Sequence, residues 1–114
     1  MKRVSCQSVE MSKRMNEYKH DLKRLANYSP SQARRLIQQS NDEFICAIRD
    51  VVWTTLAGKV PLSSEQREQV RSVQHTLRRF ASRERSVEER RRVLVTRKGV
   101  RAIQTVFDFA QWYF

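Results

Sequence analysis

The residues with the clearest chemistry in this sequence are arginines, gathered between Arg78 and Arg101. That segment carries ten basic residues against three acids, and nine of the ten are arginine. Guanidinium is always charged, donates in a fork that matches two phosphate oxygens, and stacks on flat rings. The segment therefore predicts a surface that binds phosphate groups.

The charge of the whole chain agrees with this prediction. The formal net charge is +11 on 114 residues, and the sequence pI is about 10.6, in the range typical of nucleic-acid-binding domains. The charge is concentrated: residues 81–101 hold eight basic and three acidic side chains, a net of +5, whereas residues 102–114 net −1. Charge on exposed helix faces can also serve solubility alone, but this excess and clustering favour a polyanionic partner.

The predicted contacts flank one turn between two helices, so they can converge on one surface. They are Arg78, Arg79, Arg83, Arg85, Arg90, Arg91, Arg92, Lys98 and Arg101. Three consecutive helical residues cannot all face the same way, which makes Arg91 the weakest member. We expect replacement of Arg90, Arg91 and Arg92 by glutamine to lower affinity and leave the fold intact.

Catalytic and metal-binding patterns are missing from the sequence. His20 and His75 stand apart on polar helix faces, and the sequence has no HxxxH, HExxH or CxxC pair. Gly58 and Gly99 are the two glycines, too few for a phosphate-binding glycine loop. The sequence therefore predicts a protein that is not an enzyme and uses no metal or cofactor.

Length and composition predict one all-α domain, a compact bundle of about six mostly short helices packed at steep angles. Two glycines and two prolines are few for a sheet with many turns. We expect residues 1–114 to form this domain, with residues 1–7 disordered. Neither a membrane span nor a secretion signal is predicted, so we expect an intracellular protein. Cys6 should then be a reactive thiol and Cys46 a buried, inert one.

The apolar spacing and the caps place the helices. A stripe from Met11 to Leu25 predicts one helix near 8–27, and Ser29-Pro30-Ser31-Gln32 is a capping box for the next. A second box, Ser40-Asn41-Asp42-Glu43, opens the most apolar helix, which should end at Gly58. The predicted core contains Phe44, Ile48, Val52, Val70, Val73, Leu77 and Leu94.

The second half of the chain holds three further helices. Ser63-Ser64-Glu65-Gln66 caps one of them, and Ser86-Val87-Glu88-Glu89 opens a short helix that should end at Gly99. The last helix, near 100–113, is apolar almost all round. Its aromatic end can belong to the core or can protrude as a protein interface formed by Phe109, Trp112, Tyr113 and Phe114.

From Gly58 onward the order of short motifs resembles a family of small basic proteins encoded beside capsid genes in Maverick/Polinton elements and adintoviruses. The motifs are Gly58-Lys59-Val60-Pro61-Leu62, Leu77-Arg78-Arg79-Phe80-Ala81, Ser86-Val87, Arg90–Val95 and Lys98-Gly99. The resemblance implies a virion- or genome-associated role. The chain departs from the family pattern at Val100, where the family has a second glycine, and in its tail, Gln111–Phe114.

Two function classes follow from the sequence. The first is a non-enzymatic protein that binds DNA or RNA through phosphates, without sequence preference, in a nucleus or virion. The second is an interaction module whose C-terminal helix docks on a capsid protein or on another copy of the chain. A sequence-specific helix-turn-helix reader is less favoured, because the arginine-rich 86–98 helix lacks the Asn or Gln that reads adenine.

Overall fold

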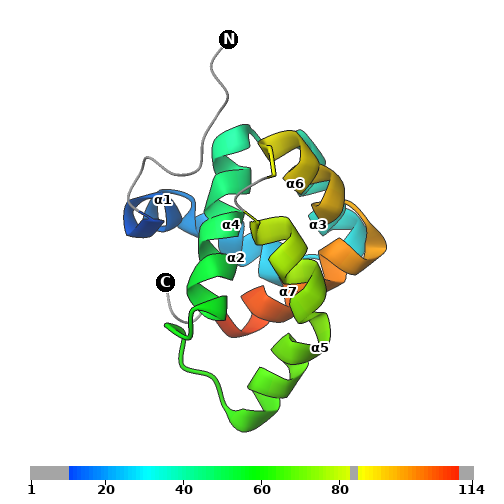
Figure 1. Ribbon diagram of the computed structural model, residues 1–114. Helices are drawn as coiled ribbons and strands as arrows, with labels where there is room; N and C mark the ends of the chain where they lie inside the picture. The colour runs from blue at the N-terminus through cyan, green and yellow to red at the C-terminus, as the bar shows by residue number, and fades with distance from the viewer. Residues whose placement is uncertain (1–10, 83–84, 111–114) are drawn as a thin grey trace.

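The computed structural model is all-helical over the residues that it describes, 11–82 and 85–110 (Figure 1). Its seven helices are α1 (Met11–Glu17), α2 (Lys19–Asn27), α3 (Pro30–Gln39), α4 (Asp42–Leu56), α5 (Ser64–Ala81), α6 (Val87–Leu94) and α7 (Arg97–Ala110). They pack into one globule, so the predicted all-α bundle is confirmed, with seven helices where about six were expected. Cys6 and residues 1–7 lie outside the described residues.

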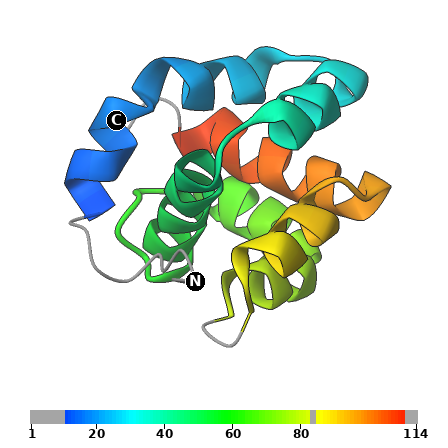
Figure 2. The same ribbon diagram turned by 90° about the horizontal axis from the view of Figure 1, so that it is seen from above.

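Helix α7 forms the centre of the globule. Its buried positions are Gly99, Val100, Ala102, Ile103, Val106, Phe107 and Ala110. In Figure 2, α2 and α3 lie on one side of α7, and α4, α5 and α6 lie on the other. These buried residues of α7 therefore form the centre of the core, and the other helices cover them.

The remaining core agrees with the prediction. Phe44, Ile48, Val52, Val70, Leu77 and Leu94 are buried, and Val73 is partly buried against them. Cys46 is also fully buried, as predicted. However, Cys46 is disulfide-bonded, so the prediction of a free thiol at this position is wrong.

The predicted 8–27 helix is wrong in one respect, because it is broken at Tyr18. Tyr18 has φ −101° and ψ 14°, outside the regular helix. The two halves pack on different elements: α1 lies against α4, and α2 lies against α7. The Tyr18 ring packs on Phe44, with ring centroids 5.9 Å apart. Separate packing partners therefore set the direction of each half.

The predicted capping boxes at Ser29–Gln32 and Ser63–Gln66 are both present. At the start of α4 the cap is Asn41, whose side chain accepts from Phe44 N, so the predicted cap at Ser40 is wrong. The Ser40 hydroxyl instead donates to Ile37 O, 2.8 Å away, and belongs to the end of α3. Gly58 ends α4 with φ +77°, a backbone conformation that glycine adopts without steric cost.

Gly99 has a different role from the one predicted. Helix α6 ends at Leu94, and the Thr96 side chain accepts from Gly99 N at 3.0 Å, so Thr96 caps α7 and Gly99 lies in its first turn. A Cβ built on Gly99 would lie 1.9 Å from the carbonyl oxygen of Val93. Gly99 therefore allows α6 and α7 to approach closely, and this junction positions the basic side chains on both helices.

Candidate phosphate-binding surface

A groove lies where α5, α6 and the first turn of α7 meet, with a volume of about 640 Å³. Its charged lining residues, which we call the basic groove, are Arg79, Arg85, Glu89, Arg92, Arg97 and Lys98. Five cations less one carboxylate leave a net charge of +4 among the described residues that line it. The positive end of the α7 dipole adds to this charge, since Thr96, Arg97 and Lys98 form the N-terminal end of that helix.

The local folding of α6 explains how these cations come together. Ser86 caps α6 by accepting from Glu89 N at 3.2 Å, which confirms the predicted cap. Arg92 is exposed on the solvent side of α6, and Arg79 is exposed on α5. Arg85 lies just before α6 and pairs with Glu89 at 3.5 Å, which holds its guanidinium at the edge of the groove. Cations from three elements thus line one surface.

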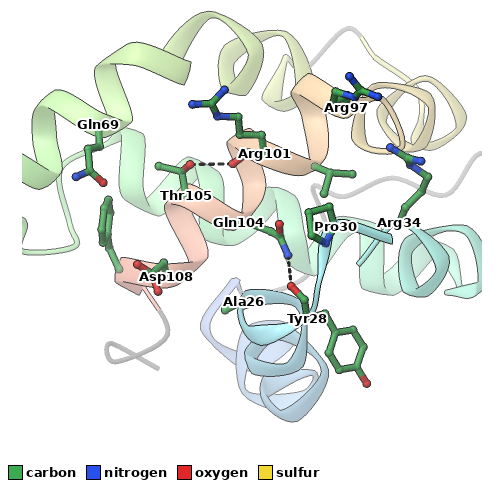
Figure 3. Close-up of a pocket in the computed structure, with 12 residues that line it drawn as sticks. Ala26, Tyr28, Pro30, Arg34, Gln69, Arg97, Arg101, Gln104, Thr105 and Asp108 are labelled. Atoms are coloured by element: carbon green, nitrogen blue, oxygen red, sulfur yellow. Dashed lines mark hydrogen bonds between the residues drawn. The ribbon is translucent and has the colours of Figure 1, made fainter. Parts of the chain in front are cut away.

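A second cavity adjoins the groove at Arg97, which lines both (Figure 3). This α7 cavity has a volume of about 520 Å³ and carries two further arginines, Arg34 from α3 and Arg101 from α7. Arg97 and Arg101 are one helical turn apart and therefore share a face of α7. The basic surface extends in this way from the groove onto α3.

The structure brings together four of the nine predicted contacts in the basic groove: Arg79, Arg85, Arg92 and Lys98. Arg101 lines the adjoining α7 cavity. Arg78 is exposed and lines a separate pocket beside Trp53 on α4, because consecutive residues of a helix face different directions. Arg83 lies outside the described residues.

Arg90 lies inside the protein, only 4% exposed, and its Nη2 donates to Ser82 O at 2.8 Å. Burial, and then repulsion from Arg49, lower the pKa of Arg90 to about 10, while Asp50 opposes this shift. A side chain buried in this way does not present its guanidinium to a phosphate at the surface. We therefore leave Arg90 out of the candidate surface.

Arg91 has a structural role between helices distant in sequence. Its Nη1 donates to Ile37 O at 2.6 Å and to Ser40 O at 2.9 Å, and its Nη2 donates to the Asp42 carboxylate at 3.0 Å. Arg91 thus binds the carbonyl end of α3 and the acidic start of α4 together. We expected that Arg90, Arg91 and Arg92 could be replaced without affecting the fold. The structural contacts of Arg90 and Arg91 disagree with this expectation.

Two arginines outside the predicted contact set also line this surface, Arg97 and Arg34. The spacing of Arg97 and Arg101 could have indicated a shared helix face. However, the expected helix boundary at Gly99 placed them on different helices. Arg34 is more than sixty residues away in the chain, and no local pattern connects it with α7.

The predicted protein interface has a different environment. Phe109 is half-buried, packs against the core and lines the α7 cavity. Trp112, Tyr113 and Phe114 lie outside the described residues. Within residues 11–82 and 85–110, no cluster of three His, Cys, Asp or Glu side chains could hold a metal ion, and no helix is long and apolar enough to cross a membrane.

Comparisons with protein-family models, with curated proteins and with solved structures found no match.

Proposed function

We propose that this protein binds nucleic acid through its phosphate groups, without reading the base sequence, and that the basic groove makes the contacts. The observation that carries the proposal is the convergence of Arg79, Arg85, Arg92, Arg97 and Lys98 on one groove with a single carboxylate, Glu89. Cations gathered in this way release the counterions condensed on a phosphate backbone when they bind it, which is the main source of non-specific affinity.

Arginine is the better residue for this task, and four of the five groove cations are arginine. Its fork donates to two phosphate oxygens at once, whereas a lysine ammonium acts as a point charge. Asn and Gln, which read adenine, are absent from the described lining residues of the groove, where Thr76 and Thr96 are the uncharged polar side chains. Affinity without sequence preference is the expected result.

The setting of this activity is part of the proposal. The resemblance of the Gly58–Gly99 motifs to capsid-linked basic proteins supports a virion or a nuclear genome as the site of action. The alternative, docking of the C-terminal helix on a capsid protein or on a second copy, has less support. The apolar residues of α7 up to Ala110, apart from the half-buried Phe109, are buried in the core of the same chain.

The test removes groove charge without touching the core. A triple variant, Arg79→Gln, Arg92→Gln and Lys98→Gln, changes exposed side chains for which the structure gives no ion pair. A matched control, Lys13→Gln, Lys59→Gln and Arg67→Gln, removes the same formal charge at exposed positions that do not line the groove. Both variants should keep the helical circular dichroism spectrum and the melting temperature of the parent protein.

Binding is then measured by fluorescence anisotropy against duplex DNA, single-stranded DNA and RNA over a series of salt concentrations. The groove variant should bind all of them more weakly, and the slope of log K against log salt should fall by about 0.9 for each lost duplex contact. The control should keep most of the parent slope. Equal affinities and slopes for the two variants would show that position in the groove is irrelevant, and the proposal would fail.

A further inference from the structure

The α7 cavity has opposite chemistry at its two ends. One face of α7 lines it, with Arg97, Arg101, Thr105 and Asp108 following each other at intervals of four and three residues. In Figure 3, Arg34 and Arg97 lie at one end of the cavity and Asp108 lies at the other. From Arg101 to Asp108 the helix rises about 10 Å, because each residue adds about 1.5 Å. The cavity is therefore cationic at one end and acidic at the other.

The cationic end has an unmet donor. Within the part of the chain that the structure describes, Arg34 Nε has no hydrogen-bond partner although the atom is shielded from solvent. Leaving a shielded donor unsatisfied is unfavourable, and a charged donor is the most costly kind. Arg34 is only half-buried, unlike Arg90, so a rotation of its side chain would bring this donor to a phosphate oxygen beside Arg97 and Arg101. The phosphate would also offset the repulsion among the three cations.

The other end suits a flat, uncharged group. Gln69 and Asp108 lie at this end in Figure 3, and the half-buried Phe109, which follows Asp108 in the chain, also lines the cavity. Asp108 repels phosphate, so an anionic backbone would keep to the arginine end. The Phe109 ring offers a stacking face, and the Gln69 amide offers a hydrogen-bonding group for a nucleobase.

From this geometry we propose that the α7 cavity receives one unstacked base of a single-stranded nucleic acid whose phosphates run along the basic groove. The proposal rests on the function proposed above and adds the substrate class, single strand in preference to duplex. Arg97 connects the two parts, since it lines both the groove and the cavity. A strand that leaves the groove at Arg97 meets Arg101 and Arg34 next, and its base can then turn toward Phe109.

Single strands fit this site because the faces of their bases are exposed. In a duplex each base is stacked between its neighbours, and extruding it costs a few kcal/mol. Stacking on one aromatic side chain favours binding of a single-stranded base and does not depend on which base it is. The α7 cavity therefore adds affinity for a single strand alone, and the basic groove adds affinity for both forms.

The test separates these two contributions. Phe109→Leu keeps an apolar side chain against the core but removes the ring. The matched control, Trp53→Leu, removes an exposed aromatic ring that lines a different pocket. The cavity variant should lower the affinity for single-stranded DNA or RNA by about 10-fold and leave duplex affinity unchanged. The control should change neither, and equal behaviour of the two variants would overturn the inference.

A measurement on the parent protein guards against misfolding of the variant. Single-stranded oligonucleotides that carry 2-aminopurine at each position in turn should change their fluorescence on binding wherever the labelled base leaves its neighbours and meets Phe109. No change in a saturated complex would overturn the inference even where groove binding persists. Loss of all binding, to duplex and single strand alike, would instead overturn the proposed function together with the inference.

Discussion

Arg14 and Asp50 form a bidentate ion pair inside the protein. Arg14 Nε lies 2.6 Å from Asp50 Oδ2, and Arg14 Nη2 lies 3.1 Å from Asp50 Oδ1. The two side chains are 1% and 0% exposed, and the pair joins α1 to α4 across 36 positions of sequence. It fixes α1 on the bundle, four residues before the helix break at Tyr18.

The surroundings of this pair are unusually cationic. Arg49 Nη1 lies 3.9 Å from Asp50 Oδ1, and the Arg49 guanidinium also lies over the Trp53 ring, 5.5 Å from its centroid. Burial raises the pKa of Asp50, while the hydrogen bond and charge of Arg14, and then the charges of Arg49 and Arg90, act in the opposite direction. Each of these arginines therefore favours the ionised carboxylate.

Replacing Arg14 by methionine should destabilise the fold strongly at neutral pH. It leaves the Asp50 carboxylate buried without its main partner, which costs about 3–5 kcal/mol of unfolding free energy in comparable pairs. Urea unfolding of the variant and the parent gives the difference. Arg24→Met is the control, because Arg24 forms an exposed pair with Asp21, and its loss should cost less than about 1 kcal/mol.

The loss of unfolding free energy caused by Arg14→Met should be smaller in acid. Without Arg14 the pKa of Asp50 rises further above its ordinary value of 3.8. A folded-state pKa above the unfolded value gives a contribution to stability that is fully present below 3.8 and is lost as pH rises through the folded-state pKa. The gap between parent and variant should therefore widen from mildly acid to neutral pH. A gap independent of pH would show that Asp50 is not the group responsible.

Arg91 and Arg92 are neighbours on α6, but replacing Arg91 should lower stability and replacing Arg92 should lower nucleic-acid affinity. Arg91→Gln removes charged hydrogen bonds to Ile37, Ser40 and Asp42 and should cost roughly 2 kcal/mol of unfolding free energy. Arg92→Gln changes an exposed groove residue, so its effect on stability should stay within about 0.5 kcal/mol while nucleic-acid affinity falls. Thermal unfolding and anisotropy on both variants check this, and the reverse pattern would contradict the assignment.

The two glycines should respond very differently to alanine. At Gly99 the added Cβ meets the Val93 carbonyl, so α6 and α7 must separate, and we expect a loss of about 3 kcal/mol or more. At Gly58 nothing lies within 4 Å of a built Cβ, so only the positive φ opposes the change. That cost should be about 1 kcal/mol. Denaturant unfolding of both variants measures the contrast, and similar losses would contradict it.

Cys46 should resist alkylation in two separate ways. In the folded protein it is fully buried, so a thiol reagent should not reach it. Because it is disulfide-bonded, unfolding in urea without a reductant should still leave it unlabelled. Mass spectrometry after labelling, with and without reductant, distinguishes the two causes. Labelling of Cys46 in urea alone would show that it is a thiol.

Much of the helical framework follows from local interactions, and for this reason the sequence predicts it. Ser29 and Gln32, or Ser63 and Gln66, are three residues apart, and their capping hydrogen bonds form within that distance whatever the rest of the chain does. Gly58 ends α4 for the same reason. The donors of Gly58 and Lys59 reach the Thr55 and Thr54 carbonyls, and the turn requires a positive φ.

Other features depend on partners far away in the chain. Ser40 and Asn41 are both good caps by residue type, and the contacts of Ser40 with Ile37 and Arg91 leave Asn41 to begin α4. The break at Tyr18 likewise reflects separate packing of α1 and α2 on α4 and α7. Helix propensity cannot reveal either result, because each local pattern allows both outcomes.

The sequence by itself determined that the protein is helical, basic and built on an apolar stripe in each of its main helices. Only the tertiary structure decided which arginines face solvent. Arg90, Arg91 and Arg92 are consecutive and chemically identical, yet one is buried, one joins α3 to α4 and one lines the basic groove. A helix rotates by about 100° per residue, so the neighbours of each side chain depend on how α6 packs on the other helices.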